Sequence, residues 1–259
     1  MRFFGKTLVV GAVLSMLVQG AFAADGLSQI KAAGEIKFGT EGTYAPFTYH
    51  DISGDLTGFD VEVGRAVAKQ LGVKATFVES KWDGLIAGLD DKRYDAVINE
   101  VSITPARQAK YDFSDPYITS HAVLLVASNN TAIKTFSDLK GKKAAETLSS
   151  NFGKIAKDNG ADIVPDNGFN ESIDLLLSGR VDATVNDSLS YLDFKKHKPD
   201  AKIKQVAVYE GGSNDQSAIL VRKGDPELVA AINHALATIK SNGTYLKISE
   251  KYFGKDVSK

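Results

Sequence analysis

Short runs of β-branched and other apolar residues alternate along the chain with amphipathic stretches of helical period. The apolar runs predict strands, and the amphipathic stretches predict helices. The expected strands are 35–38, 75–78, 95–98, 124–127, 143–145 and 162–164, and the expected helices are 60–71, 85–92, 151–158, 172–177, 188–196, a helix from Pro226, and 244–253. A turn and hairpin should follow the first strand. This alternation is typical of an α/β protein.

One nine-residue pattern occurs twice. Residues 92–100 (KRYDAVINE) resemble residues 179–187 (GRVDATVND). In each copy an amphipathic helix leads through Arg-x-Asp-Ala into a buried strand, which ends in Asn followed by an acid. The repeat predicts two lobes of related build. Each lobe would place an acidic side chain at the carboxyl end of a strand, the edge at which open α/β sheets bind ligands.

The first 23 residues differ from the rest of the chain. Arg2 and Lys6 give a positive start, residues 7–18 are apolar, and Ala21-Phe22-Ala23 is a small-x-small cleavage site, which predicts a signal peptide at 1–23. Its apolar stretch is shorter than the roughly 20 residues that cross a bilayer, and no other segment is apolar enough to do so. No cysteine follows the signal to carry a lipid anchor. We therefore expect a soluble protein exported to a Gram-negative periplasm.

Composition excludes several function classes. A length of 259 residues suits two lobes, and 43% hydrophobic with 24% charged residues excludes disorder, collagen and coiled coil. The chain has no cysteine and four scattered histidines, and it lacks a phosphate loop, a dinucleotide fingerprint and a nucleophile elbow. We therefore expect no metal and no cofactor. A net charge of −1 without a basic tract argues against a nucleic-acid partner.

Two expected helix starts are candidate anion sites. Thr104 should cap a helix that begins at Pro105, which places Arg107 in the first turn, where the helix dipole disfavours a cation by about 0.3–1 kcal/mol. Free N–H groups beside a guanidinium suit a carboxylate held bidentately. Ser150 should cap the helix that begins at Asn151. A surface arginine paired with an acid explains the first pattern equally well, and most helix starts of the second kind are only caps.

Three further side chains could complete a site for a zwitterion. Asp187 lies just beyond a strand, where it either caps its own helix or accepts a cation. Together with Arg107 it could hold both ends of a dipolar molecule. Tyr44 and Trp82 follow strands in expected loops, where they either pack in the core or sandwich an apolar side chain.

Several longer motifs resemble one known family. The stretches are GTEGTYAPF at 39–47, GFDVE at 58–62, SITPAR at 102–107, YDFSDPY at 111–117, GTY at 243–245 and KYFG at 251–254. Together they resemble the periplasmic solute-binding proteins of polar amino acid ABC transporters, over essentially the whole mature length.

The resemblance implies a two-lobed periplasmic binding protein fold of type II-like α/β architecture. Residues 24–119 plus 212–259 would form lobe 1 and residues 120–211 lobe 2, with hinge crossings near 118–121 and 212–216. It implies that an amino acid binds to one lobe, that the second lobe closes over it, and that the closed form docks on an inner-membrane ABC permease. Such a protein is a monomer and not an enzyme.

By position in the family motif, five residues would bind the head group of the ligand. Arg107 matches the carboxylate clamp, helped by Ser102, Ser150 and Asn151. Asp187 matches the acid that receives the α-ammonium. This chain has AAETLSS at 144–150 where many relatives have a glycine-rich approach to the anion site.

Five more residues would surround the rest of the ligand. Tyr44 and Trp82 match aromatic walls, and the backbone near Asn99 would assist the α-ammonium. Glu41 matches an acid that helps hold a distal cation. Glu100 stands where relatives often carry a small or amide residue, and it should disfavour anionic side chains by like-charge repulsion.

Within the family, the cystine-binding members are most similar at SKWDGL (80–85), TLSSNFG (147–153) and ATVNDS (183–188). Cystine has a second ammonium group, which Glu100 or Glu41 could receive. Arginine, lysine and glutamine remain alternative ligands. A rival of another class is a dehydratase on the same fold, in which Glu100 would be the general acid.

Overall fold

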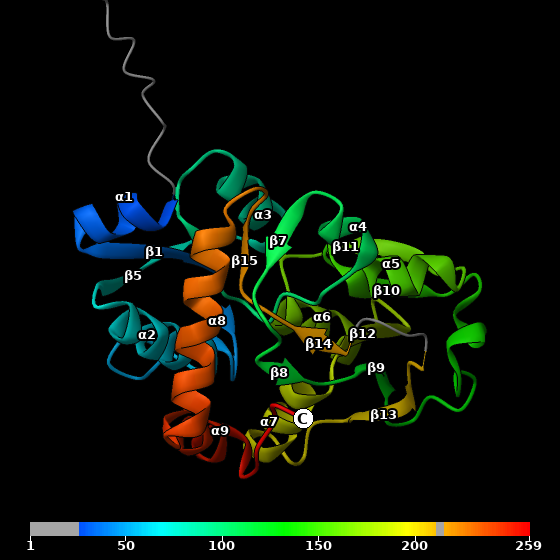
Figure 1. Cartoon of the computed structure of the whole chain (residues 1–259). Helices are drawn as coiled ribbons and strands as arrows, with labels where there is room; N and C mark the ends of the chain where they lie inside the picture. The colour runs from blue at the N-terminus through cyan, green and yellow to red at the C-terminus, as the bar shows by residue number, and fades with distance from the viewer. Residues whose placement is uncertain (1–25, 211–214) are drawn as a thin grey trace, which may run out of the picture.

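The computed structural model describes residues 26–210 and 215–259, and the expected signal peptide lies outside these residues. Two five-stranded sheets form two lobes, which Figure 1 shows side by side. In the first sheet the order is β5 (Lys74–Glu79), β1 (Glu35–Thr40), β6 (Ala96–Val97), β15 (Leu220–Arg222) and β7 (Tyr111–Phe113). In the second it is β11 (Asp162–Pro165), β10 (Lys143–Glu146), β12 (Ala183–Asp187), β9 (Ala122–Ala127) and β13 (Ile203–Val208). The expectation of a two-lobed α/β fold is confirmed.

Helices cover the sheets because each sheet is apolar on both faces. Lobe 1 carries α1 (Gly26–Ala33), α2 (Phe59–Leu71), α3 (Trp82–Asp90), the single turn α4 (Pro105–Gln108), α8 (Pro226–Ser241) and α9 (Thr244–Phe253). It also has a small sheet of β2 (Thr43–Tyr44), β3 (Thr48–His50) and β4 (Leu56–Thr57). Lobe 2 carries η1 (Phe136–Leu139), α5 (Asn151–Asp158), α6 (Phe169–Leu177) and α7 (Ser188–His197). In the described ranges, no helix combines the length and apolar character needed to cross a bilayer.

The two copies of the repeated segment occupy equivalent places. Each enters the central strand of its sheet, β6 or β12, which has a parallel neighbour on one side and an antiparallel neighbour on the other. Asp95 accepts a hydrogen bond from Lys37 N at 2.8 Å, and Asp182 accepts one from Lys143 N at 2.9 Å. The repeat therefore reflects two similar sheets whose corresponding carboxyl ends carry Asn and an acid.

The two lobes are joined by a pair of extended crossings. The strands β8 (Ile118–Thr119) and β14 (Gln216–Ser217) pair in antiparallel fashion between the lobes. Ser120 N extends this pairing by donating to Asp215 O at 2.8 Å. The strand β8 lies within 118–121, the range in which the resemblance implies the first crossing. Part of the expected return, at 211–214, lies outside the described residues.

Most expected elements are present, and the differences lie at their ends. The helix expected at 85–92 is α3, which starts at Trp82 and ends at Asp90, because Lys92 has a left-handed backbone with φ 57°. Trp82 is therefore the first residue of a helix and not part of a loop. The helix expected at 172–177 is α6, which starts at Phe169, directly after Gly168 with φ 124°. A left-handed residue such as Lys92 ends a helix because it turns the next N–H away from the ladder.

Candidate ligand-binding site

A cavity of about 40 Å³, counted as the space open to the centres of water molecules, lies between the lobes. Both lobes line it at the carboxyl ends of their strands, where an α/β sheet presents ligand sites. Lobe 1 contributes Glu41, Thr43, Tyr44, Trp82, Asn99 and Glu100, and lobe 2 contributes Thr147, Ser150, Asn151, Phe152, Gly168, Phe169 and Asn186. The structure thus brings seven of the ten sequence-predicted site residues to one cavity. The other three are Arg107, Ser102 and Asp187, which lie beside it.

Aromatic rings form the walls of the cavity. Tyr44 and Trp82 are both 8% exposed. The Tyr44 hydroxyl donates to Asn186 Oδ1 at 2.9 Å, which connects the two lobes. Phe169 lies across from Tyr44 with ring centroids 6.5 Å apart. Sequence reasoning missed Phe169 and Asn186, although the repeat makes Asn186 the counterpart of Asn99.

Arg107 occupies the first turn of α4, as its spacing predicts. The cap is present, since Thr104 Oγ1 accepts from Arg107 N at 3.3 Å. The guanidinium donates through Nη1 to Ser102 O at 3.0 Å and lies 5.2 Å from the centroid of the Trp82 ring. Burial lowers the pKa of Arg107 to about 10, opposed by the negative charge of Glu100. Arg107 lines a groove next to the cavity, together with Ser150 and Asn151.

Asp187 both ends β12 and caps α7. Its Oδ1 accepts from Leu189 N at 2.8 Å and from Ser190 N at 3.2 Å. Burial raises the pKa of Asp187 to about 6, and the hydrogen bonds to Ser120, Leu189 and Ser190 oppose this rise. Capping uses only one carboxylate oxygen. The capping interpretation therefore holds, and the cap itself does not use Oδ2.

The charge of Glu100 interacts with the charges of both Arg107 and Asp187. Its Oε1 accepts from Ser217 Oγ at 2.9 Å and from Ser120 Oγ at 3.2 Å, and its side chain is buried. Burial raises the pKa of Glu100 well above its usual range, and the charge of Asp187 raises it further.

A third acid lies beneath Glu100. Asp60 accepts from Glu100 N at 2.6 Å and from the Tyr117 hydroxyl at 2.9 Å. Burial raises the pKa of Asp60 to about 7. Among the described residues, no ion pair includes Asp60, Glu100 or Asp187. Three buried carboxyl groups that form no ion pair favour a positively charged guest.

A fourth acid belongs to a different part of the cavity. Glu41 Oε2 accepts from Asn99 Nδ2 at 2.7 Å, and Asn99 Oδ1 accepts from Glu41 N at 2.8 Å. Burial raises the pKa of Glu41 to about 7, although the Asn99 hydrogen bond opposes the rise. The reciprocal pair fixes this carboxyl group at the end of β1, so that it can serve as a second acceptor for a cation.

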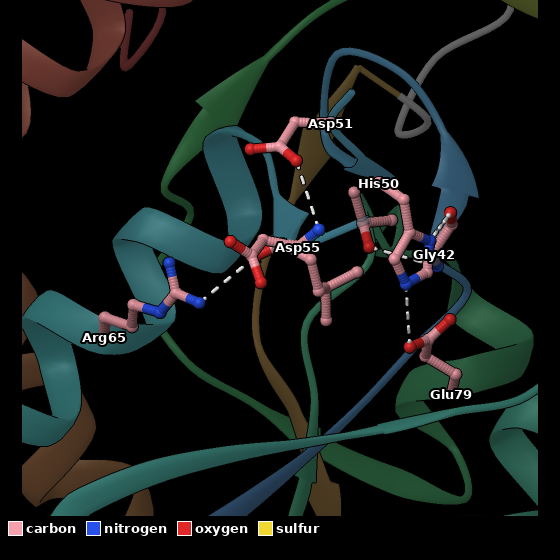
Figure 2. Close-up of polar contacts among 8 residues, drawn as sticks. Gly42, His50, Asp51, Asp55, Arg65 and Glu79 are labelled. Carbon is pink, nitrogen blue, oxygen red and sulfur yellow. Dashed lines mark hydrogen bonds and ion pairs between the residues drawn. The ribbon is translucent and has the colours of Figure 1, made fainter. Parts of the chain in front are cut away.

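The loop that carries Glu41 is held from behind by a polar network (Figure 2). His50 Nδ1 lies 3.2 Å from Gly42 O, and His50 Nε2 lies 3.3 Å from Glu79 Oε1. Gly42 has φ 74°, and a Cβ there would come within 2.2 Å of Glu79 Oε2, so a side chain at this position would be strained and would displace the Glu79 carboxylate. The network holds the Glu41–Tyr44 loop in place, and His50 and Glu79 do not line the cavity.

The lobes are closed on each other. Asp83 Oδ1 accepts from Ser149 N at 2.9 Å and from Ser149 Oγ at 2.7 Å. Lys81 Nζ donates to Asn167 Oδ1 at 2.8 Å. These contacts lie on either side of Trp82 at the start of α3. Lys81 and Asp83 therefore bind lobe 2, and we call residues 81–83 the clasp. The ring of Trp82, between them, lines the cavity.

Two hinged α/β lobes that close over a cavity define the class of two-lobed solute-binding proteins. Residues 36–255 match the bacterial extracellular solute-binding proteins, family 3. The chain belongs to this family.

Named relatives include cystine-binding proteins. The L-cystine-binding protein TcyA of Bacillus subtilis is 45% identical over 90% of this chain and 86% of its own length. The L-cystine solute receptor of Neisseria gonorrhoeae, in its unliganded open conformation, is 46% identical, with a TM-score of 0.61 over 91% of this chain and all of that chain. An ancestral arginine-binding protein bound to arginine is 41% identical, with a TM-score of 0.79 over 85% of this chain and 99% of that chain. The less identical, ligand-bound structure overlaps better, as expected if the lobes here are closed.

Proposed function

We propose that the chain is the substrate-binding component of an amino-acid ABC importer and that it holds L-cystine between its closing lobes. The observation that carries the proposal is one buried guanidinium and a set of buried, unpaired carboxyl groups around a single inter-lobe cavity. The identity of 45% to TcyA and 46% to the gonococcal cystine receptor supports cystine as the ligand. Arginine, lysine and glutamine are the alternatives.

The head group of the ligand would be held by residues beside the cavity. Arg107 has five N–H donors and uses one of them on Ser102 O, so the others are available for a carboxylate. Ser150 and the N–H groups at the start of α5 face the same groove. Asp187, next to Glu100, would accept the α-ammonium. The two charges therefore come from different lobes, and only the closed form can engage both.

The second ammonium of cystine would be accepted by Glu41. A neutral amide such as glutamine would leave that charge uncompensated, and a second acid such as glutamate would be repelled by Glu100. Ligand binding also opposes the raised pKa values of the acids, because a nearby cation stabilises the ionised form.

Transport follows from the closure. A ligand that contacts both lobes binds the closed form better and shifts the population toward it. We place the protein in the periplasm as a monomer after removal of residues 1–23, with lobe boundaries at 119/120 and 211/212. The closed form would then be recognised by an inner-membrane permease.

The test is a thermal shift screen with the common amino acids and L-cystine. We expect the largest upward shift with cystine, since a ligand that binds only the folded form adds about 2.7 kcal/mol at 100 times its dissociation constant. A response to arginine without one to cystine would overturn the cystine assignment alone. Arg107→Ala should abolish every response. Unchanged affinity in that variant contradicts the head-group assignment.

The dehydratase alternative has a separate assay. A buried acid with a raised pKa, such as Glu100, is suited to act as a general acid. Incubation with prephenate or arogenate should give no aromatic product. Product formed by the natural chain and lost in Glu100→Gln would replace binding by catalysis as the function.

A further inference from the structure

A hydroxyl group in the hinge connects two acids of the site that come from different lobes. Ser120 directly follows β8, in the first crossing between the lobes, and is 5% exposed (Figure 1). Its Oγ donates to Glu100 Oε1 at 3.2 Å, and its hydroxyl also forms a hydrogen bond with the Asp187 side chain. Glu100 follows β6 of lobe 1, and Asp187 ends β12 of lobe 2. A hinge residue therefore lies between one carboxyl group from each lobe.

The three groups are held in place by separate parts of the molecule. Ser120 N donates to Asp215 O at 2.8 Å, which ties Ser120 to the second crossing. Glu100 Oε1 also accepts from Ser217 Oγ, in that second crossing, at 2.9 Å. Asp187 is fixed in lobe 2 because it caps α7. The spacing of the three groups therefore depends on how the two lobes are set about the hinge.

The two acids occupy equivalent positions in the repeated segment but have different partners. Asp187 is followed directly by α7, and its carboxylate caps that helix. Glu100 has a left-handed backbone with φ 49°, and the next helix, α4, begins only at Pro105. Because Glu100 has no adjacent helix to cap, its carboxylate bonds to Ser120 and Ser217 of the two crossings. The difference between the two copies thus connects the acid of lobe 1 to the hinge.

The hydroxyl of Ser120 cannot satisfy both acids at once. A hydroxyl group carries a single hydrogen, so it donates to only one of the two carboxyl groups at a time. Two ionised carboxylates cannot donate in return, and their like charges repel each other. An ammonium group has three N–H donors and a compensating charge, so it can bond the carboxyl group that Ser120 does not. The arrangement therefore suits a ligand that brings an ammonium group.

We propose that Ser120 is a positioning residue of the hinge, whose hydroxyl holds Glu100 and Asp187 at the spacing that one ammonium group requires and thereby couples the charge of the ligand to closure. The proposal rests on the proposed function, since it requires an amino-acid ligand. Ser120 lies in none of the stretches that carry the family resemblance, and it does not line the cavity. Without its hydroxyl the two acids would repel each other across the lobes, and the closed form would lose population.

The test is isothermal titration calorimetry with L-cystine. Ser120→Ala removes the hydroxyl, and Ser120→Thr keeps it. Glu100→Gln removes one of the two charges, and combining it with Ser120→Ala completes a double-mutant cycle. Ser114→Ala is the matched control, because Ser114 is a buried serine of lobe 1 whose hydroxyl bonds to the backbone groups Asp115 O and Ile219 N.

We expect Ser120→Ala to weaken binding about five- to tenfold, and Ser120→Thr and Ser114→Ala to change it less than about twofold. In the Glu100→Gln background, Ser120→Ala should weaken binding by about twofold or less, because one of the repelling charges is already gone. An equal loss in both backgrounds would overturn the proposal, since it would show that Ser120 acts by packing alone. Unchanged affinity in Ser120→Ala would overturn it as well.

The affinity of the natural chain separates this proposal from the proposed function. L-arginine replaces L-cystine in the titrations if the natural chain binds only arginine, since both ligands carry an α-ammonium group. The cystine assignment then fails, and the cycle still decides the role of Ser120. A natural chain that binds neither ligand would overturn the proposed function, and the proposal with it.

Discussion

At the scale of single residues, the site is unusual for its buried acids. Asp60, Glu100 and Asp187 are each at most 4% exposed, and neighbouring hydroxyl and N–H groups, not cations, hold them. Such an arrangement is tolerated because protonation removes the charge that burial disfavours. A cationic ligand beside these acids would therefore favour their ionised forms.

The pKa of Asp60 predicts how stability depends on pH. In the folded chain this pKa is raised from 3.8 to about 7, so the folded state binds a proton that the unfolded state has released. The resulting stability is fully present below the unfolded pKa and is lost as pH rises through about 7. We expect the midpoint of thermal unfolding of the ligand-free protein to fall as pH rises from about 4 to about 7 and to level off above that range. Differential scanning calorimetry measures it.

Two isosteric variants separate Asp60 from other titrating groups. Asp60→Asn should give a shallower decline with pH than the natural chain, because an amide does not titrate. Glu100→Gln should do the same if Asp60→Asn fails to fold. A midpoint that rises over this pH range, or equal slopes in all three proteins, would contradict the assignment.

At the scale of elements, the repeated segment accounts for the left-handed backbone conformation of Lys92. Lys92 and Gly179 are the first residues of the two copies, and both have left-handed backbones, with φ 57° and 70°. Both are exposed. Gly179 has nothing within 4 Å of an added Cβ. Glycine adopts this conformation without the penalty that a side chain imposes.

Exchanging the residue types at these positions should therefore move stability in opposite directions. We expect Lys92→Gly to raise the free energy of unfolding by about 0.5–1 kcal/mol and Gly179→Lys to lower it by about 1 kcal/mol. Urea denaturation followed by circular dichroism gives both values. A loss of stability in Lys92→Gly would show that the Lys92 side chain contributes more than its backbone conformation costs.

The elements were more predictable than their arrangement at the site. Periodicity and caps locate α5 and α9 at their observed bounds, and Asp225 caps α8 as expected. Local rules work there because a cap and its partner lie within one turn. The N-terminus of α3 was missed because no capping side chain marks it, since Lys81 makes no side-chain cap bond.

The sequence predicts which residues belong to the candidate site but not which of them contact one another. The family motif and the strand ends indicate residues such as Arg107 and Asp187. Nothing local reveals that Tyr44 meets Asn186 or that Asp83 meets Ser149, because these pairs are 142 and 66 residues apart. Phe169 joins the cavity for the same reason, since only closure brings lobe 2 to Tyr44.

At the scale of the whole molecule, closure is a balance of small terms. Hydrogen bonds between lobes, from the clasp at 81–83 and from Ser190 Oγ to Ala45 O at 2.9 Å, stabilise the closed form by about 0.5–1.5 kcal/mol each. The two buried donors without a partner, Trp82 Nε1 and Asn151 Nδ2, each oppose closure by about 1–3 kcal/mol. Repulsion between the carboxyl groups of Glu100 and Asp187, which come from different lobes, also opposes closure. A ligand that supplies an acceptor and a cation removes both opposing terms.

The clasp gives the last prediction. Asp83→Ala removes two hydrogen bonds between lobes, and its carboxylate does not line the cavity. Since the closed form alone engages both lobes of the site, we expect the affinity for the ligand to fall about three- to tenfold, mostly through faster dissociation. Stopped-flow fluorescence of Trp82 measures the rate. Asp112→Ala is the control, because Asp112 pairs with Lys223 at 3.1 Å and lines neither the cavity nor the groove of Arg107. Equal dissociation rates in both variants would contradict the prediction, because they would show that the hydrogen bonds of Asp83 do not slow the release of the ligand.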